Sequence, residues 1–125
     1  MTKILVLNGF DPLEEIEDYL VSEFPVVEFA FRRADHEGEM VDWLRGALDC
    51  DGLIINPGAR THYSPALHDA LEAVAVPKVE AHLSNIHAGE DRRLSVVSPA
   101  VDAVVAGMGI FGYRAAVSHI LQRIS

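Results

Sequence analysis

Apolar and polar residues alternate along this chain in two rhythms, which predict a regular succession of strands and helices. Short runs rich in aliphatic or aromatic residues are typical of strands buried in a sheet. Between them, apolar residues recur at three- and four-residue spacing, which predicts helices. The expected strands cover residues 3–7, 26–31, 52–56, 78–82 and 102–106. The expected helices begin at or just after Pro12, Asp35, Ser64 and Gly109.

The alternation of strands and helices predicts the fold class. It indicates an α/β protein with a parallel sheet and helices on both faces, because crossovers between parallel strands are right-handed. Five strands favour a flavodoxin-like three-layer sandwich with the strand order 2-1-3-4-5. No linker, repeat or low-complexity tract interrupts the sequence, so we expect one domain covering residues 1–125.

Composition and charge narrow the class of partner. The formal net charge is −9, which argues against a general nucleic-acid or anionic-membrane surface. No signal peptide is visible, and the longest apolar runs fall short of the ~20 residues that a membrane helix needs. The single cysteine, Cys50, fits a reducing compartment, and its neighbours Asp49 and Asp51 predict an inert thiol. We therefore expect a cytoplasmic protein with a small-molecule partner.

Polar residues stand at the ends of three strands that are neighbours in the expected sheet. Asn8 and Asn56 end the first and third strands, and Glu80 and His82 end the fourth. Ligands of such sheets bind outside the carboxyl ends of the strands. Glu80 and His82 share a strand face, and a carboxylate can hold a histidine ready to act as a general acid or base. The polar loop of residues 83–85 could offer backbone N–H groups to an anion.

Other kinds of site are less well supported by the sequence. His62, His82 and His87 could gather around a metal ion, but no metal-ligand spacing links them, so we expect no metal. Residues 107–112 spell GxGxxG after the last strand rather than the first, which favours a tight turn and close packing over a nucleotide site. No GxSxG motif marks a serine hydrolase. The alternative for His82 is a histidine that ties down a loop.

Four segments resemble the type II 3-dehydroquinate dehydratases and follow one another as in that family. The family motifs are HEGELxDWI, NPGAxTHTS, VEVHLSNIHARE and GxGxxGY. The matching segments are residues 36–43 (HEGEMVDW), 56–64 (NPGARTHYS), 79–88 (VEAHLSNIHA) and 107–113 (GMGIFGY). The resemblance covers nearly the whole chain. It implies a lyase of the shikimate pathway, which serves aromatic amino acid biosynthesis, removing water from 3-dehydroquinate through an enolate without metal or organic cofactor.

The resemblance also implies roles for single residues. His82 would be the general acid at the leaving hydroxyl, and Glu80 would hold it. Asn56 and the backbone N–H groups of Leu83 and Ser84 would receive the substrate carboxylate.

Three further positions follow from the same resemblance. His62 and Arg93 would bind ring hydroxyls of a small anionic cyclic hydroxy-acid. Asp69 would reach into the site of a neighbouring subunit, since the family assembles as trimers that build a dodecamer.

One part of the family pattern is missing. The family's first strand is followed by a lid, NGPNLNxLGxREPxxYG, whose Arg and Tyr activate the reaction and remove the C2 proton. Here residues 8–11 run directly into the first helix, so we expect that the lid is deleted. Asp11 aligns with an Asn that positions an enolate-stabilising water, and a carboxylate there would repel the enolate. Gly89 stands where the family has an Arg.

Three hypotheses follow from these departures. The first is a divergent dehydratase in which Arg60 and Tyr63 replace the lid pair, with Tyr63 as the base. Tyr19 is a poorer candidate because it falls within the first expected helix. The second is a lyase acting on a related cyclic hydroxy-acid. The third is a non-catalytic binding or scaffold homologue that keeps the pocket and the assembly.

Overall fold

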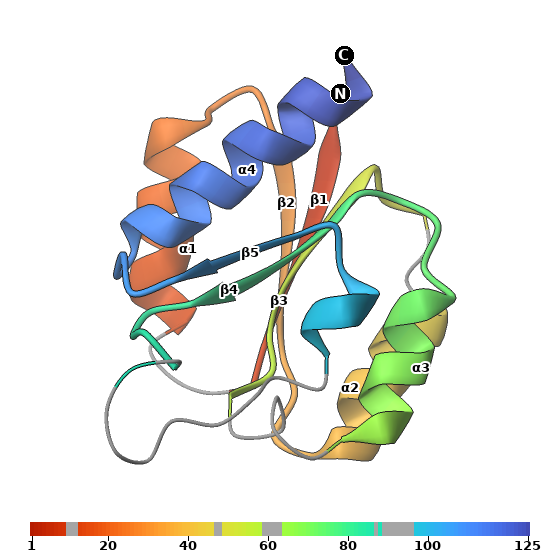
Figure 1. The fold of residues 1–125 in the computed structure, drawn as a ribbon. Helices are drawn as coiled ribbons and strands as arrows, with labels where there is room; N and C mark the ends of the chain where they lie inside the picture. Colours follow the sequence, from red (N-terminus) through yellow and green to blue (C-terminus); the bar gives the residue numbers. More distant parts are fainter. Residues whose placement is uncertain (10–12, 47–48, 59–63, 87, 89–96) are drawn as a thin grey trace.

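Five parallel strands form the middle layer of the computed structural model of this protein (Figure 1). The structure describes residues 1–9, 13–46, 49–58, 64–86, 88 and 97–125. The strands are β1 (Lys3–Asn8), β2 (Glu28–Arg33), β3 (Gly52–Asn56), β4 (Lys78–His82) and β5 (Ala103–Ala106). Their order is β2-β1-β3-β4-β5, and every neighbouring pair is parallel. The α/β fold class and the strand order expected from the sequence are confirmed.

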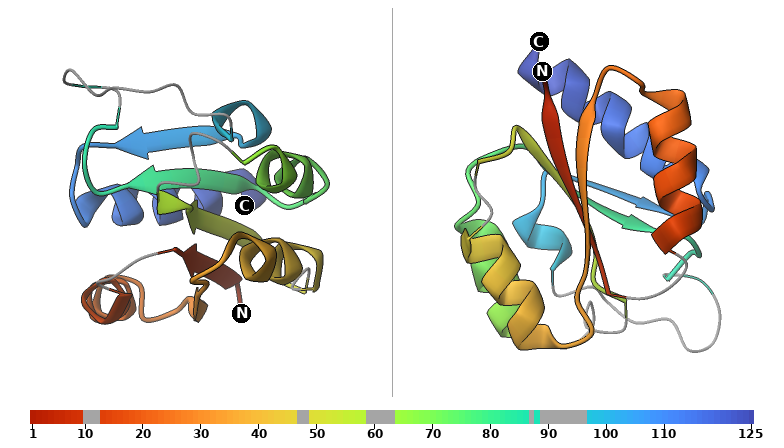
Figure 2. Two further views of the ribbon diagram at one scale, coloured as in Figure 1. Left: turned by 90° about the horizontal axis from the view of Figure 1, so that it is seen from below. Right: turned by 180° about the vertical axis from the view of Figure 1, so that it is seen from behind.

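Helices cover both faces of the sheet (Figure 2). One face carries α1 (Leu13–Glu23) and α4 (Phe111–Ile124). The other carries α2 (Glu37–Gly46), α3 (Pro65–Glu72) and the short 3₁₀ helix η2 (Ser98–Ala100). Within the described residues, none of these helices has the length and apolar character needed to cross a membrane.

The apolar core is split into two halves by the sheet. Successive residues of a strand point to opposite faces. Ile4 and Val6 of β1 therefore pack with the α1/α4 half, whereas Leu5 and Leu7 pack with the α2/α3 half. Because both faces are covered, β1 needs apolar residues at every position, and this is why its sequence is nearly continuous in aliphatic residues.

The second strand starts two residues later than the sequence predicted. Val26 is 73% exposed and lies before the strand, while Arg32 and Arg33 belong to β2. Pairing with β1 sets these limits, since the register runs from Lys3 opposite Glu28 to Asn8 opposite Arg33. β2 is an edge strand and can therefore carry exposed arginines that a central strand could not.

The glycines after β5 form a turn, as expected for residues 107–112. Gly107 and Gly109 have φ of 83° and 58°, a region that suits glycine. A Cβ atom on Gly112 would lie 3.0 Å from Cγ1 of Val105, so α4 begins in close contact with β5. The tight turn and close packing predicted for this motif are confirmed.

Candidate active site

Three central strands bring polar residues together at their carboxyl ends, which form one edge of the sheet. Asn8 and Asn56 end β1 and β3 and lie opposite each other in the strand register. His82 ends β4, the next strand along. Asn8, Asn56, Glu80 and His82 are all buried. The predicted convergence of strand ends is therefore present at the edge where ligands of this fold bind.

The side chains at this edge divide between the two faces of the sheet. Asn8 and Asn56 follow Val6 and Ile54 by two residues and so point toward α1 and α4. Glu80 lies opposite Ile55, whose side chain belongs to the α2/α3 half of the core. The site consequently consists of two separate groups of polar residues.

The first group, here named the acid cluster, consists of Glu80, His82 and Ser98. His82 Nε2 is hydrogen-bonded to Glu80 Oε2, and Ser98 Oγ donates to Glu80 Oε1 over 2.7 Å. Glu80 is 0% exposed and His82 is 4% exposed. A buried carboxylate is tolerated only with partners of this kind. The contact expected from the two-residue spacing is present, and its catalytic role stays a prediction.

The imidazole of His82 has one nitrogen bonded to Glu80 and one with no hydrogen-bond partner among the described residues. Its Nε2 faces the carboxylate of Glu80, which places an N–H on that nitrogen. Among the described residues, none is hydrogen-bonded to Nδ1 of His82. Nδ1 is thus the nitrogen that can exchange a proton with a ligand.

The second group, here named the amide cluster, consists of Asn8, Asn56 and Tyr113. The backbone N–H of Gly58 donates to Asn56 Oδ1 over 3.2 Å, and Asn56 Nδ2 donates to the Tyr113 hydroxyl over 3.1 Å. That hydroxyl donates to Asn8 Oδ1 over 2.8 Å. Because a backbone N–H can only donate, Gly58 sets the direction of every bond in this series. Asn8 Nδ2, at its far end, is buried and unpaired with respect to the described residues.

Burial limits the acid–base chemistry of Tyr19 and Tyr113, the two tyrosines that the structure describes. It raises the pKa of Tyr113 far above its ordinary value, and the hydrogen bonds with Asn56 and Asn8 offset this only in part. Burial and the nearby Glu23 carboxylate also raise the pKa of Tyr19, which packs edge-on against Phe111. A phenol with a raised pKa is a poor general base at neutral pH. Neither tyrosine therefore suits the missing base.

The remaining predicted site residues fall into two sets. Leu83 is half-buried and its carbonyl accepts from Gly109 N over 2.9 Å, whereas Ser84 is exposed. The other predictions, on Asp11, Arg60, His62, Tyr63 and Arg93, lie outside the described residues, as does His87.

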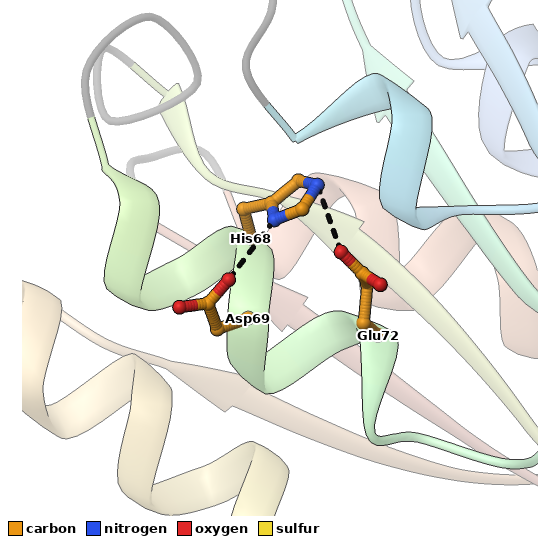
Figure 3. Close-up of side chains that lie close together, drawn as sticks. All are labelled: His68, Asp69 and Glu72. Atoms are coloured by element: carbon orange, nitrogen blue, oxygen red, sulfur yellow. Dashed lines mark hydrogen bonds and ion pairs between the residues drawn. The ribbon is translucent and has the colours of Figure 1, made fainter.

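Asp69 lies on α3 beside a histidine and a glutamate (Figure 3). His68 Nδ1 is 3.2 Å from Asp69 Oδ1, and His68 Nε2 is 3.2 Å from Glu72 Oε1. The two carboxylates thus face different nitrogens of one ring, which describes an exposed ion-pair network better than a set of ligands around one metal ion. Asp69 is on the protein surface, with a side chain 80% exposed.

Two residues of the site were missed at the level of sequence. Tyr113 is the last residue of the family-like segment 107–113, and no local pattern there points to the site, although a buried tyrosine hydroxyl usually requires a hydrogen-bond partner. Ser98 lies outside the four family-like segments and in no GxSxG motif. Its relation to Glu80 depends on how the chain returns to the sheet before β5, and no local spacing indicates it.

The fold and the two clusters define a class: a doubly wound α/β protein with a buried histidine–carboxylate pair at the carboxyl ends of its strands. Within that class, the chain belongs to the dehydroquinase class II family, whose model matches residues 3–121. The resemblance seen in the sequence motifs is thereby confirmed.

Individual relatives agree with this assignment. A 3-dehydroquinate dehydratase of Thermotoga petrophila is 50% identical over 99 residues, covering 78% of this chain and 68% of the relative. 3-Dehydroquinate dehydratase 1 of Agrobacterium fabrum is 45% identical over 123 residues, covering 95% of this chain and 84% of the relative. The crystal structure of type II dehydroquinase from Butyrivibrio crossotus superposes with a TM-score of 0.89 at 31% identity, covering 96% of this chain and 97% of that one.

Proposed function

We propose that this protein is a carbon–oxygen lyase that converts 3-dehydroquinate to 3-dehydroshikimate and water through an enolate. Membership in the dehydroquinase class II family and relatives named 3-dehydroquinate dehydratase support this activity. The observation that carries it is the buried Glu80–His82 pair at the end of β4. Loss of a hydroxyl requires a proton donor, and this pair is the described group best built to supply one.

His82 is the general acid in this proposal. Its Nδ1 delivers a proton to the leaving hydroxyl, while Nε2–H remains bonded to Glu80. The carboxylate stabilises the imidazolium and holds the ring plane. Burial removes competing water and strengthens this interaction.

Asn56 and the loop after β4 are proposed to bind the substrate carboxylate. One N–H of the Asn56 amide is used by Tyr113, and the second is the one proposed to donate to the carboxylate. The backbone N–H groups of Leu83 and Ser84 would add two donors from the neighbouring strand end. Arg93 would supply local positive charge in a chain of net charge −9, and with His62 it would bind the ring hydroxyls.

Tyr63 is proposed as the base, assisted by Arg60. The sequence between Asn8 and the first helix has no counterpart of the family's lid tyrosine, and the chain contains three tyrosines in all. Tyr19 and Tyr113 both have raised pKa values and buried hydroxyl groups. Tyr63→Phe should therefore abolish turnover while leaving substrate binding; full turnover in that variant would exclude Tyr63.

An assembly of trimers, built up to a dodecamer, is also proposed. Asp69 is exposed on α3 and free of the core, as a residue reaching into a neighbouring subunit's site must be. Sedimentation would give the oligomer size. Mixing an Asp69→Ala chain with an inactive His82→Asn chain should give hybrid sites that recover activity. We also propose a cytoplasmic location, on the basis of the lone, buried Cys50 thiol.

The direct test is to mix the protein with 3-dehydroquinate and follow the ultraviolet absorbance of the conjugated product. The proposal predicts a rise for the natural sequence and none for His82→Asn. The missing lid motif favours a second candidate function. The protein would either bind a cyclic hydroxy-acid without converting it, or act as a lyase on a related cyclic hydroxy-acid. No absorbance rise, together with a rise in melting temperature on adding 3-dehydroquinate, would favour that candidate.

A further inference from the structure

We infer that Ser98 is a positioning residue for the acid cluster: it holds the carboxylate of Glu80, which in turn sets the direction of the His82 imidazole. The inference rests on the proposed function in one respect, that His82 acts as the proton donor. It goes beyond that function because Ser98 has no place in the motifs that define the pair.

The position of Ser98 is determined by the core. Ser98 opens η2, and the flanking Val97 and Ala100 are buried in the α2/α3 half of the core, at 0% and 5% exposure. Directly afterwards the chain enters β5, which is paired with β4. The start of β4 is tied to the same segment, since Lys78 N donates to Asp102 Oδ2 over 2.8 Å. This packing places the Ser98 hydroxyl against the middle of β4.

The two oxygens of Glu80 have different partners. Oε1 accepts from Ser98 over 2.7 Å, and Oε2 is bonded to His82 Nε2. Rotation about the last bond of a glutamate side chain is loosely restricted. Hydrogen bonds on both oxygens restrict the plane of the carboxylate more closely than a bond on one oxygen does. Because Nε2 is bonded to this carboxylate, the plane of the carboxylate sets the orientation of the imidazole. The orientation of the ring in turn sets the direction in which Nδ1 points.

A single hydroxyl, remote from the Glu80–His82 pair in the sequence, thus orients the proposed acid through the carboxylate of Glu80.

The test compares Ser98→Ala with Ser98→Thr. Loss of the donor should lower kcat about tenfold, a fraction of what a general acid contributes, with KM within about twofold. Threonine keeps the hydroxyl and should restore most of kcat. The proton between His82 Nε2 and Glu80 should give a far-downfield nuclear magnetic resonance signal, identified by its absence in His82→Asn. That signal should move upfield or broaden in Ser98→Ala and remain in Ser98→Thr.

Ser64→Ala is the matched control, because it removes a serine hydroxyl with a purely structural partner. Ser64 caps α3 by accepting from Leu67 N over 3.1 Å. Its loss should lower the melting temperature and leave the downfield signal unchanged. If Ser98→Ala does not fold, Ser98→Cys replaces it, since a thiol is a weaker donor and should shift the signal in the same direction.

An unchanged downfield signal in the folded Ser98→Ala or Ser98→Cys variant would overturn the inference. The signal does not depend on turnover. A natural protein inactive on 3-dehydroquinate would therefore defeat the proposed function while the role of Ser98 was still decided by the spectrum.

Discussion

The acid cluster and the amide cluster share one edge of the sheet but are built in different ways. The acid cluster is ionisable, and Glu80 and His82 lie within one strand. The amide cluster is neutral, and the two bonds of its Tyr113 hydroxyl join residues 57 and 105 positions apart. The Glu80–His82 pair is local in the sequence and ionisable. The amide cluster connects distant segments of the chain and is neutral.

This difference suggests a division of labour between the faces. The ionisable groups of the acid cluster lie on the α2/α3 face, where His82 is the proposed proton donor. The hydrogen bonds of the amide cluster lie on the α1/α4 face, where they hold the side chain of Asn56. Substitutions in the two clusters should therefore separate loss of turnover from loss of stability.

The largest effect is expected from His82→Asn. It removes the proposed proton donor, so kcat for 3-dehydroquinate should fall by about 10²–10⁴-fold. His119→Asn is the control, because His119 lies half-buried on α4, remote from the acid cluster in the chain. Its turnover should equal that of the natural protein. If His82→Asn lost less than about tenfold, the acid cluster would not be the catalytic one, and the comparison would fail.

Tyr113→Phe should affect stability more than chemistry. It leaves Asn8 Oδ1 and Asn56 Nδ2 buried without the hydroxyl that bonds them, which should cost about 1–3 kcal/mol of unfolding free energy. KM should rise as Asn56 loosens. Denaturant titration and steady-state kinetics measure the two effects.

Tyr19→Phe is the matched control for that substitution. The Tyr19 hydroxyl is buried and makes no close hydrogen bond with a described residue, and burial together with the nearby Glu23 carboxylate raises its pKa. Removing it should be neutral or slightly stabilising. Equal losses in the two variants would show that the hydrogen bonds of the amide cluster add nothing.

The amide cluster should also give the protein a characteristic response to alkali. The pKa of Tyr113 is raised in the folded state by burial, whereas an unfolded tyrosine ionises near pH ~10. The unfolded state therefore releases this proton first, so the stability is intact below pH ~10 and is lost as the pH rises further. The loss should approach about 1.4 kcal/mol per pH unit for this one group. Denaturant titrations at several alkaline pH values should show that the unfolding free energy declines less steeply in Tyr113→Phe than in the natural protein. Parallel curves for the two proteins would contradict this prediction.

Local patterns were sufficient for most of the fold and for half of the site. β1 and β3 were predictable because burial on both faces leaves a continuous aliphatic signal, and Glu80–His82 because residues two apart share a strand face. β2 was misplaced because an edge strand takes its limits from its partner, and Val26 resembles a strand residue as much as Phe29 does.

The other half of the site depends on distant contacts. Asn8 and Tyr113 are bonded across 105 positions, and Ser98 meets Glu80 across 18. No periodicity encodes such contacts, which follow from the strand order and from the packing of η2 and α4 against the sheet. The division of the polar groups between two faces likewise depends on the strand register, which places Glu80 opposite Ile55 rather than Ile54.

The smallest expected effects come from the glycine turn that links β5 to α4. Gly107 and Gly109 both have positive φ, so alanine at either position should cost about 1 kcal/mol of unfolding free energy. They differ in their surroundings: a Cβ on Gly107 would lie 3.1 Å from Cβ of Asn85, whereas a Cβ on Gly109 would have no atom of a described residue within 4 Å. Asn85 belongs to the loop of residues 83–85, in which the backbone N–H groups of Leu83 and Ser84 are proposed to bind the substrate carboxylate. Gly107→Ala should therefore raise KM as well as lower stability, and Gly109→Ala should lower stability alone. Equal KM values in the two variants would show that this loop does not bind the substrate carboxylate. Asn56 of the amide cluster would then be the described residue that remains to bind it.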